Sequence, residues 1–279
     1  MYRHLTPDPE CHMRLAEIRV HPIKSCRPVQ RTSANVEARG LQHDRRYMIV
    51  DRTGTFVTLR TLPQLSFIDV AIGDADYGVQ LPGGPSFAIP HEPVEGPWVR
   101  VGVWGDALWA REHVEAGALL SDWAGLPLRL VGMVEGTSER SLPGGGAPMS
   151  FADAWPLLCL SRSSVDDLSA RVGSGMAVDR FRPNLVFDDV AAYEEDTFAA
   201  VRVGAVQFRG ATLCSRCVAT TIDPQTGVMG TEPLTTLAGY RRFDSGVYLG
   251  ANLAPDGAGA IRVGDPVEVL RRAEPRLSL

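Results

Sequence analysis

Short hydrophobic segments with a period of two constrain the fold of this chain more than any other feature. In the N-terminal half they occur at Leu15–Val20, Tyr47–Val50, Phe67–Ile72 and Trp98–Val103. Each is bounded by Gly, Pro or Asp, and alternation between such turn residues is typical of β-strands. The pattern therefore predicts a barrel or a sandwich of short strands in this half.

Strand patterns return in the second half at Asn184–Phe187 and Ala200–Phe208, and Ala260–Leu270 is expected to form a turn-linked strand pair. Helical spacing of apolar residues interrupts the strands twice. It predicts one helix from about Glu112 to Trp123 and a second from about Ser163 to Val172, where serines followed by aspartates give a capping signal. The predicted fold class is α+β and β-rich, with two barrel-like units and flanking helices.

A length of 279 residues corresponds to about two domains. The segment Glu135–Pro148 has the most linker-like composition in the chain. It is interpreted either as a connection between domains or as a mobile loop over a site. Residues 1–12 lack the apolar stretch of a signal peptide and are interpreted as a leader, with Met13 as an alternative start.

The overall composition argues against several classes of protein. Hydrophobic residues make up 44% of the chain and charged residues 22%, which is typical of a soluble globular protein and not of a disordered one. The net charge is −5 and the basic residues are scattered, so no nucleic-acid partner is expected. No apolar run approaches the roughly 18 residues of a membrane span, so no membrane anchor is expected. Five cysteines in a chain of this size favour a reducing, cytoplasmic location.

The densest chemical signal is the C-x-x-C segment from Cys214 to Cys217. A structural zinc site would need a second ligand pair, and all six histidines lie far upstream. A thioredoxin-like redox pair would open a helix, whereas a β-branched stretch follows here. Two readings remain open. Either one sulfur is a thiolate ligand or nucleophile, which Arg216 would stabilise, or both cysteines are buried and carry no chemistry.

Cations and amides at strand ends form a second candidate set. Lys24 and Ser25 follow the first predicted strand, Arg45 precedes the second, and Arg182 and Asn184 precede a later one. Lys24 is the single lysine among 28 basic residues, a ratio that codon bias explains. Each residue alone fits a solvated side chain or a turn. Together with a thiolate they would suit a phosphorylated cofactor whose reactive metal needs a sulfur ligand.

At this point the sequence resembles the MOSC family with its N-terminal β-barrel domain, a group that includes the mitochondrial amidoxime-reducing component and bacterial reductases of N-hydroxylated compounds. The segments that carry the resemblance are His21–Cys26, Gly40–Tyr47 with Asp51, Val57–Arg60 with Pro63 and Leu65, Phe151–Leu158, Arg180–Asn184, Cys214–Pro224 with Gly227, Gly250–Asn252 and Val263–Val267. The resemblance implies an N-terminal β-barrel-like domain over residues 13–132, a MOSC domain over residues 133–275, and a molybdenum cofactor site between them.

The family motifs also imply roles for matching residues. Cys217 would be the thiolate ligand of molybdenum and the catalytic residue, while Cys214 would be structural. Lys24, Ser25 and Arg45 would hold the phosphate of the molybdopterin. Further residues are implied to contact or line the cofactor: Arg182, Asn184, Asp153, Ala154, Trp155, Ser215, Arg216 and Asn252.

The implied activity is a molybdenum-dependent oxidoreductase that removes oxygen from N-hydroxylated substrates such as hydroxylamines and amidoximes. Since the chain stops nine residues after Leu270, electrons are expected to come from a separate ferredoxin-, flavin- or cytochrome-type protein. One alternative is a carrier of molybdenum cofactor or sulfur without turnover. Another is a non-catalytic binding protein on the same scaffold.

Overall fold

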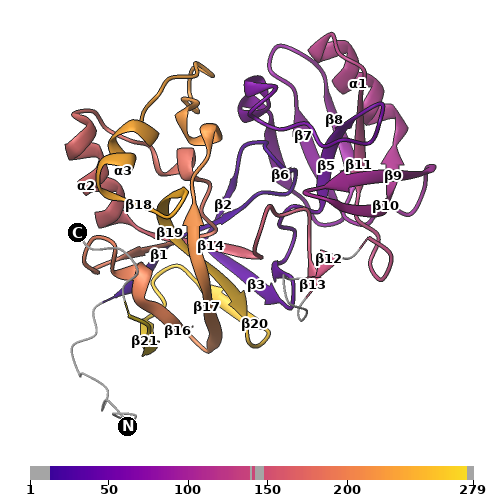
Figure 1. Ribbon diagram of the computed structural model, residues 1–279. Coiled ribbons are helices and arrows are strands. Elements are labelled where there is room, and N and C mark those ends of the chain that lie inside the picture. The colour runs from indigo at the N-terminus through magenta and orange to yellow at the C-terminus, as the bar shows by residue number, and fades with distance from the viewer. Residues whose placement is uncertain (1–12, 139, 142–147, 275–279) are drawn as a thin grey trace.

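The computed structural model describes residues 13–138, 140–141 and 148–274. Its main element is a nine-stranded mixed sheet built largely from the second half of the chain (Figure 1). In spatial order its strands are β2 (Val29–Arg31), β1 (Arg14–Val20), β15 (Leu185–Asp188), β14 (Leu157–Ser161), β19 (Gly246–Pro255), β17 (Val206–Ser215), β16 (Phe198–Val203) and β21 (Val267–Arg272), and β18 (Arg242–Phe243) pairs with β19. The predicted β-rich α+β fold is confirmed.

The N-terminal half contributes a four-stranded antiparallel sheet, and three smaller sheets complete the fold, two of them with a strand from the second half of the chain. The four strands, in spatial order, are β5 (Tyr47–Asp51), β11 (Leu128–Gly132), β10 (Asp106–His113) and β9 (Trp98–Val103). The smaller sheets contain β6 (Asp69–Ile72), β7 (Asp76–Gln80) and β8 (Ser86–Pro90); β3 (Ser33–Glu37), β4 (Gly40–Leu41) and β20 (Gly259–Arg262); and β12 (Arg140–Ser141) with β13 (Pro148–Met149).

Strands from the start of the chain pair with strands from its end. β1 runs antiparallel to β15, and β3 runs antiparallel to β20. In Figure 1 the dark β1 and β3 accordingly lie among the orange and yellow strands of the second half. The apolar side chains of these strands share one core, which includes Leu15, Val36 and Ile261. Strand pairs thus join the two sides of the predicted domain boundary between residues 132 and 133. The position of that boundary stays a prediction.

Three α-helices occur among the described residues. α1 (Val114–Ala124) and α2 (Arg162–Val172) confirm the two predicted helices, and the hydroxyl of Ser161 caps α2 by accepting the amide N–H of Ser164. The short α3 (Leu234–Tyr240) was not predicted. It packs with α2 and β19 around a small core of their buried apolar residues. No helix in the described part of the chain is long and apolar enough to cross a bilayer.

The expectation of a turn-linked strand pair within Ala260–Leu270 was wrong. β20 pairs with β3 and β21 pairs with β16, so the two strands belong to different sheets. The physical reason is that the turn between them is bound by β1. The Leu15 amide donates to the Asp265 carbonyl at 3.0 Å, and the Gly264 amide donates to the Leu15 carbonyl at 2.8 Å. Competition from β1 therefore separates the strands.

Two of the predicted segments lie partly or wholly outside the described residues. These are the leader, residues 1–12, and half of the glycine-rich segment Glu135–Pro148, namely residues 139 and 142–147. In the described part the ends of the strands converge on one region. Loops that follow β1 and precede β5, β14 and β15 meet the C-terminal end of β17 there, and these loops carry the candidate site residues.

Candidate functional site

A cavity of about 910 Å³ is lined by residues from both halves of the chain. All twelve site residues proposed from the sequence line this one cavity: Lys24, Ser25, Arg45, Asp153, Ala154, Trp155, Arg182, Asn184, Ser215, Arg216, Cys217 and Asn252. They come from loops and strands that are far apart in sequence. The fold therefore brings the whole predicted set together, while the role of each residue stays a prediction.

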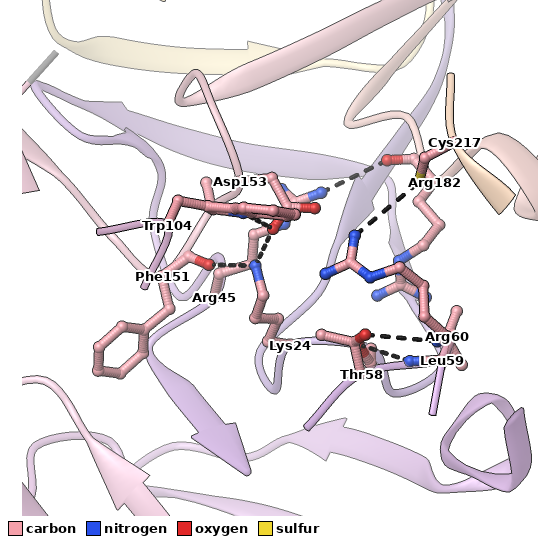
Figure 2. A network of polar contacts seen from close by, with 12 residues as sticks. Lys24, Arg45, Thr58, Leu59, Arg60, Trp104, Phe151, Asp153, Arg182 and Cys217 are labelled. Atoms are coloured by element: carbon pink, nitrogen blue, oxygen red, sulfur yellow. Dashed lines mark hydrogen bonds and ion pairs between the residues drawn. The ribbon is translucent and has the colours of Figure 1, made fainter. Parts of the chain in front are cut away.

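Lys24 is held in place by acceptors from the loop before β14. Its ammonium donates to the Phe151 carbonyl at 2.8 Å and forms an ion pair with Asp153, which also accepts the indole N–H of Trp104 at 2.9 Å (Figure 2). Burial lowers the pKa of Lys24, and Asp153 partly offsets this. Burial alone would raise the pKa of Asp153, but Lys24 and Trp104 bring it well below its usual range. An ammonium has three donors, so one N–H of Lys24 remains for a ligand.

Arg45 is oriented by a buried carboxylate that the sequence reasoning did not single out. Its guanidinium forms an ion pair with Asp44 and donates to the Asn184 side-chain carbonyl at 3.1 Å. Asp44 also accepts the amide of His21 at 2.8 Å and the amide group of Asn184 at 3.0 Å. Asp44 thus ties the loop after β1 to the segments that begin β5 and β15.

Asn184 was expected to contact the pterin, and its hydrogen bonds point to a positioning role instead. Its carbonyl oxygen accepts from Arg45 and from the Leu158 amide, and its NH₂ group donates to Asp44 and the Arg19 carbonyl. These four bonds use the ordinary capacity of the side chain, which is fully buried. A direct ligand contact from Asn184 therefore stays a prediction that the observed bonding does not favour.

Arg182 has hydrogen-bonding capacity that the protein does not use. Its Nη2 atom is buried and has no partner among the described residues. Its backbone has a positive φ of 57°, which turns the side chain into the cavity ahead of β15. Burial and the nearby charge of Arg45 lower the pKa of Arg182 to about 10, so its guanidinium remains charged at neutral pH. An unpartnered buried cation is the feature expected of a binding site for an anion.

The two cysteines of the C-x-x-C segment have different surroundings. Cys217 is exposed, and Nη1 of Arg60 lies 3.9 Å from its sulfur (Figure 2). The sulfur of Cys214 is half-buried and accepts from Nη1 of Arg216 at 2.9 Å. Arg216 was expected to stabilise a thiolate beside it in sequence at Cys217, but its guanidinium turns to Cys214 and to the Phe181 carbonyl instead. Arg60 supplies the cation at Cys217.

We expect iodoacetamide at pH 8 to modify Cys217 and then Cys214 in the cofactor-free protein, and to leave Cys26 and Cys159 unmodified. The last two thiols are fully buried, and burial raises the pKa of Cys26 to about 12 and that of Cys159 well above its usual range. Peptide mass spectrometry of a Cys11→Ser variant measures the order. Modification of Cys26 before Cys217 would contradict the surroundings described above.

Basic side chains dominate the cavity. Seven line it and only three acidic ones do. The basic set is Lys24, Arg45, Arg60, Arg140, Arg180, Arg182 and Arg216, and the acidic set is Asp106, Asp153 and Asp244. Arg60, Arg140 and Arg180 had no assigned role, although Arg60 and Arg180 lie in segments that carried the family resemblance. The charge balance, the unpartnered Arg182 and the exposed thiol of Cys217 fit a large anionic ligand with a thiophilic centre.

Comparison with known proteins identifies the family. The MOSC N-terminal beta barrel domain matches residues 12–127, and the MOSC domain matches residues 147–268. Mitochondrial amidoxime-reducing component 1 of Mus musculus is 31% identical over 281 residues, which cover 92% of this chain and 82% of the relative. The chain belongs to the MOSC family.

Two further relatives of this MOSC protein give similar values. Mitochondrial amidoxime-reducing component 1 of Homo sapiens is 30% identical, covering 92% of this chain and 82% of its own length. Mitochondrial amidoxime reducing component 2 of Bos taurus is 29% identical, covering 91% and 82%. The resemblance inferred from the sequence motifs is confirmed.

Proposed function

We propose that this MOSC protein binds molybdenum cofactor in the 910 Å³ cavity and reduces N-hydroxylated compounds with electrons from a separate protein. The observation that carries the proposal is the convergence of cations and one exposed thiol, Cys217, on a single cavity. The relatives named as amidoxime-reducing components support the same reaction class.

The residues of the cavity suggest a division of tasks. The free N–H of Lys24, the hydroxyl of Ser25 and the guanidinium of Arg45 hold the phosphate of the cofactor. The unpartnered Nη2 atom of Arg182 donates to the pterin, and the sulfur of Cys217 binds the metal. When bound, the cofactor supplies a two-electron redox centre that can accept the oxygen of a substrate.

Fixed orientation is the contribution of the surrounding polar network. Asp44 and Asn184 hold Arg45, and Asp153 holds Lys24, so these cations need little reorganisation when an anion binds. The loop before β14 contributes the Phe151 carbonyl and Asp153 to the same network. A preorganised set of donors would fix the cofactor relative to Cys217 and to the cavity opening.

A reduction assay tests the proposal. Protein purified with molybdenum cofactor is mixed with reduced methyl viologen and benzamidoxime, and the formation of benzamidine is followed by chromatography. We expect turnover that scales with bound molybdenum. Bound molybdenum without reduction of benzamidoxime or an N-hydroxylamine would overturn the reductase and favour the carrier. A chain that binds no cofactor would favour the non-catalytic binding protein.

Lys24 gives a sharper test of cofactor binding. We expect Lys24→Ala to lower the molybdenum retained after gel filtration about tenfold, because a buried ammonium at the phosphate position is lost. Arg271→Ala removes an exposed cation on β21 and is the matched control, expected to retain molybdenum as the unmodified protein does. If both variants retained the same amount of molybdenum, Lys24 would have only a structural role as the partner of Asp153.

A further inference from the structure

The β-turn between β9 and β10 carries an unexpected residue. Trp104 and Gly105 are its two central residues, with φ values of 52° and 94°. Such turns favour Asn-Gly, because a bulky side chain in the left-handed region is strained. Trp104 is also 55% exposed, so burial of its ring does not compensate for that strain. Strain at an exposed aromatic residue beside a cavity indicates a functional position.

Trp104 holds the side chain of Arg60. The guanidinium carbon of Arg60 lies 4.7 Å from the centre of the Trp104 ring and 5.6 Å from that of Phe56. Trp104 is in turn fixed by the hydrogen bond from its indole N–H to Asp153. Stacking on two rings confines the flexible arginine to one position over the cavity, as Figure 2 shows for its approach to Cys217.

Arg60 differs from most other cations of the cavity in its partners. Lys24, Arg45, Arg140 and Arg180 each form an ion pair with an aspartate. Among the residues that the structure describes, no carboxylate forms an ion pair with Arg60, whose polar contact is with the sulfur of Cys217 at 3.9 Å. A restrained guanidinium with free donors is suited to bidentate recognition of a carboxylate.

We propose that Arg60, positioned by Trp104, selects N-hydroxylated substrates that carry a carboxylate. The inference rests on the proposed function and specifies the substrate class of the same site. Nη1 of Arg60 approaches the sulfur of Cys217, so in the described part of the chain its Nη2 and Nε donors remain for a carboxylate on the side away from the thiol. A carboxylate bound there would be separated from the reactive centre that this thiol is proposed to hold, as the two groups of a para-substituted benzene ring are. Neutral substrates such as benzamidoxime would be reduced without this contact.

The first experiment compares 4-carboxybenzamidoxime with benzamidoxime. We expect kcat/KM of the unmodified protein to favour the carboxylated substrate at least fivefold, chiefly through KM. Because Arg60 also lies beside the sulfur of Cys217, rates are compared per bound molybdenum. In Arg60→Gln the preference disappears, since kcat/KM for the carboxylated substrate falls at least fivefold more than kcat/KM for benzamidoxime. Arg100→Gln, on the outer face of β9, is the control and keeps the preference. An equal loss for both substrates per bound molybdenum overturns the proposal.

Binding of probes that are not reduced separates this inference from the reductase activity. Titration calorimetry compares 4-carbamoylbenzoate with benzamide on the protein loaded with cofactor. We expect the carboxylate to bind at least tenfold more tightly, and Arg60→Gln to remove the difference. This result would support the Arg60 site even if no N-hydroxylated compound were reduced. Equal affinity of the two probes for the unmodified protein overturns it.

Variants of Trp104 test its positioning role. Trp104→Phe keeps an aromatic ring beneath Arg60 but loses the indole N–H, and we expect it to retain most of the preference for the carboxylated substrate. Trp104→Ala loses the ring as well and should lower the preference to that of Arg60→Gln, with no more loss of molybdenum than in Trp104→Phe, since both variants lose the hydrogen bond to Asp153. Identical behaviour of the two variants would show that the ring does not position Arg60.

Discussion

Replacement of Cys217 by alanine is expected to lower reduction of benzamidoxime at least about 100-fold, which corresponds to about 2.7 kcal/mol of lost transition-state stabilisation. The reason is that Cys217 is proposed as the only protein sulfur bound to the metal. Its side chain is exposed, so its removal should leave the free energy of unfolding almost unchanged. Activity and molybdenum content of the purified variant are the measurements.

The matched control for Cys217 is Cys214, three residues away. Its sulfur is half-buried and accepts a hydrogen bond from Arg216, which fits a structural role. We expect Cys214→Ala to retain at least a third of the activity. Cys217→Ser should behave like the alanine variant, because a hydroxyl is a hard ligand and a poor substitute for a thiolate. Full activity of Cys217→Ala, or a larger loss in Cys214→Ala, would reverse the assignment.

Much of this site could be predicted because its chemistry is local in the sequence. The pairs Lys24–Ser25, Arg182–Asn184 and Ser215–Cys217 lie in short segments at strand ends. Alternating hydrophobic residues predicted those strands, and cations or thiols that follow strands are recognisable candidates. The family motifs then linked the segments, and the fold brings them together on one cavity.

What could not be predicted depends on contacts between distant segments. Asp44 has no chemical signal of its own in the sequence, and its contacts with His21 and Asn184 join three segments that are far apart along the chain. The adjacency of Arg216 to Cys217 gave the wrong partner, since neighbouring side chains at the end of a strand point to opposite sides. Trp104 directly follows the predicted strand Trp98–Val103, and its importance arises from the turn that it forms and from its hydrogen bond to Asp153.

The ion pair of Arg241 and Asp196 lies in the layer behind the cavity. Arg241 is fully buried and Asp196 nearly so, and Nη2 of the arginine lies 2.5 Å from the carboxylate. Arg241 also donates to the carbonyl of Tyr248, a residue that lines the cavity. Removal of one member of such a pair leaves a buried charge without its counterpart. The pair therefore affects both the stability of the fold and the position of the backbone at Tyr248 in the cavity wall.

Asp196→Asn is expected to lower the free energy of unfolding by about 3–5 kcal/mol, since the guanidinium of Arg241 cannot lose its proton. Arg241→Met should cost less in acid, because the remaining carboxyl can become neutral. Burial already raises the pKa of Asp196, and loss of Arg241 would raise it further. A carboxyl with a raised pKa in the folded state destabilises the fold above that pKa, so the deficit of Arg241→Met should shrink as the pH falls towards 5.

Thermal unfolding between pH 5 and pH 8 distinguishes these variants. The deficit of Asp196→Asn should stay nearly constant over this range, and that of Arg241→Met should grow with pH. The double variant Arg241→Met with Asp196→Leu should recover most of the stability, because the pair leaves Asp196 Oδ1 and Arg241 Nη1 without partners among the described residues. A double variant no more stable than Asp196→Asn would show that the ion pair itself, and not the avoidance of an unpaired buried charge, stabilises this layer.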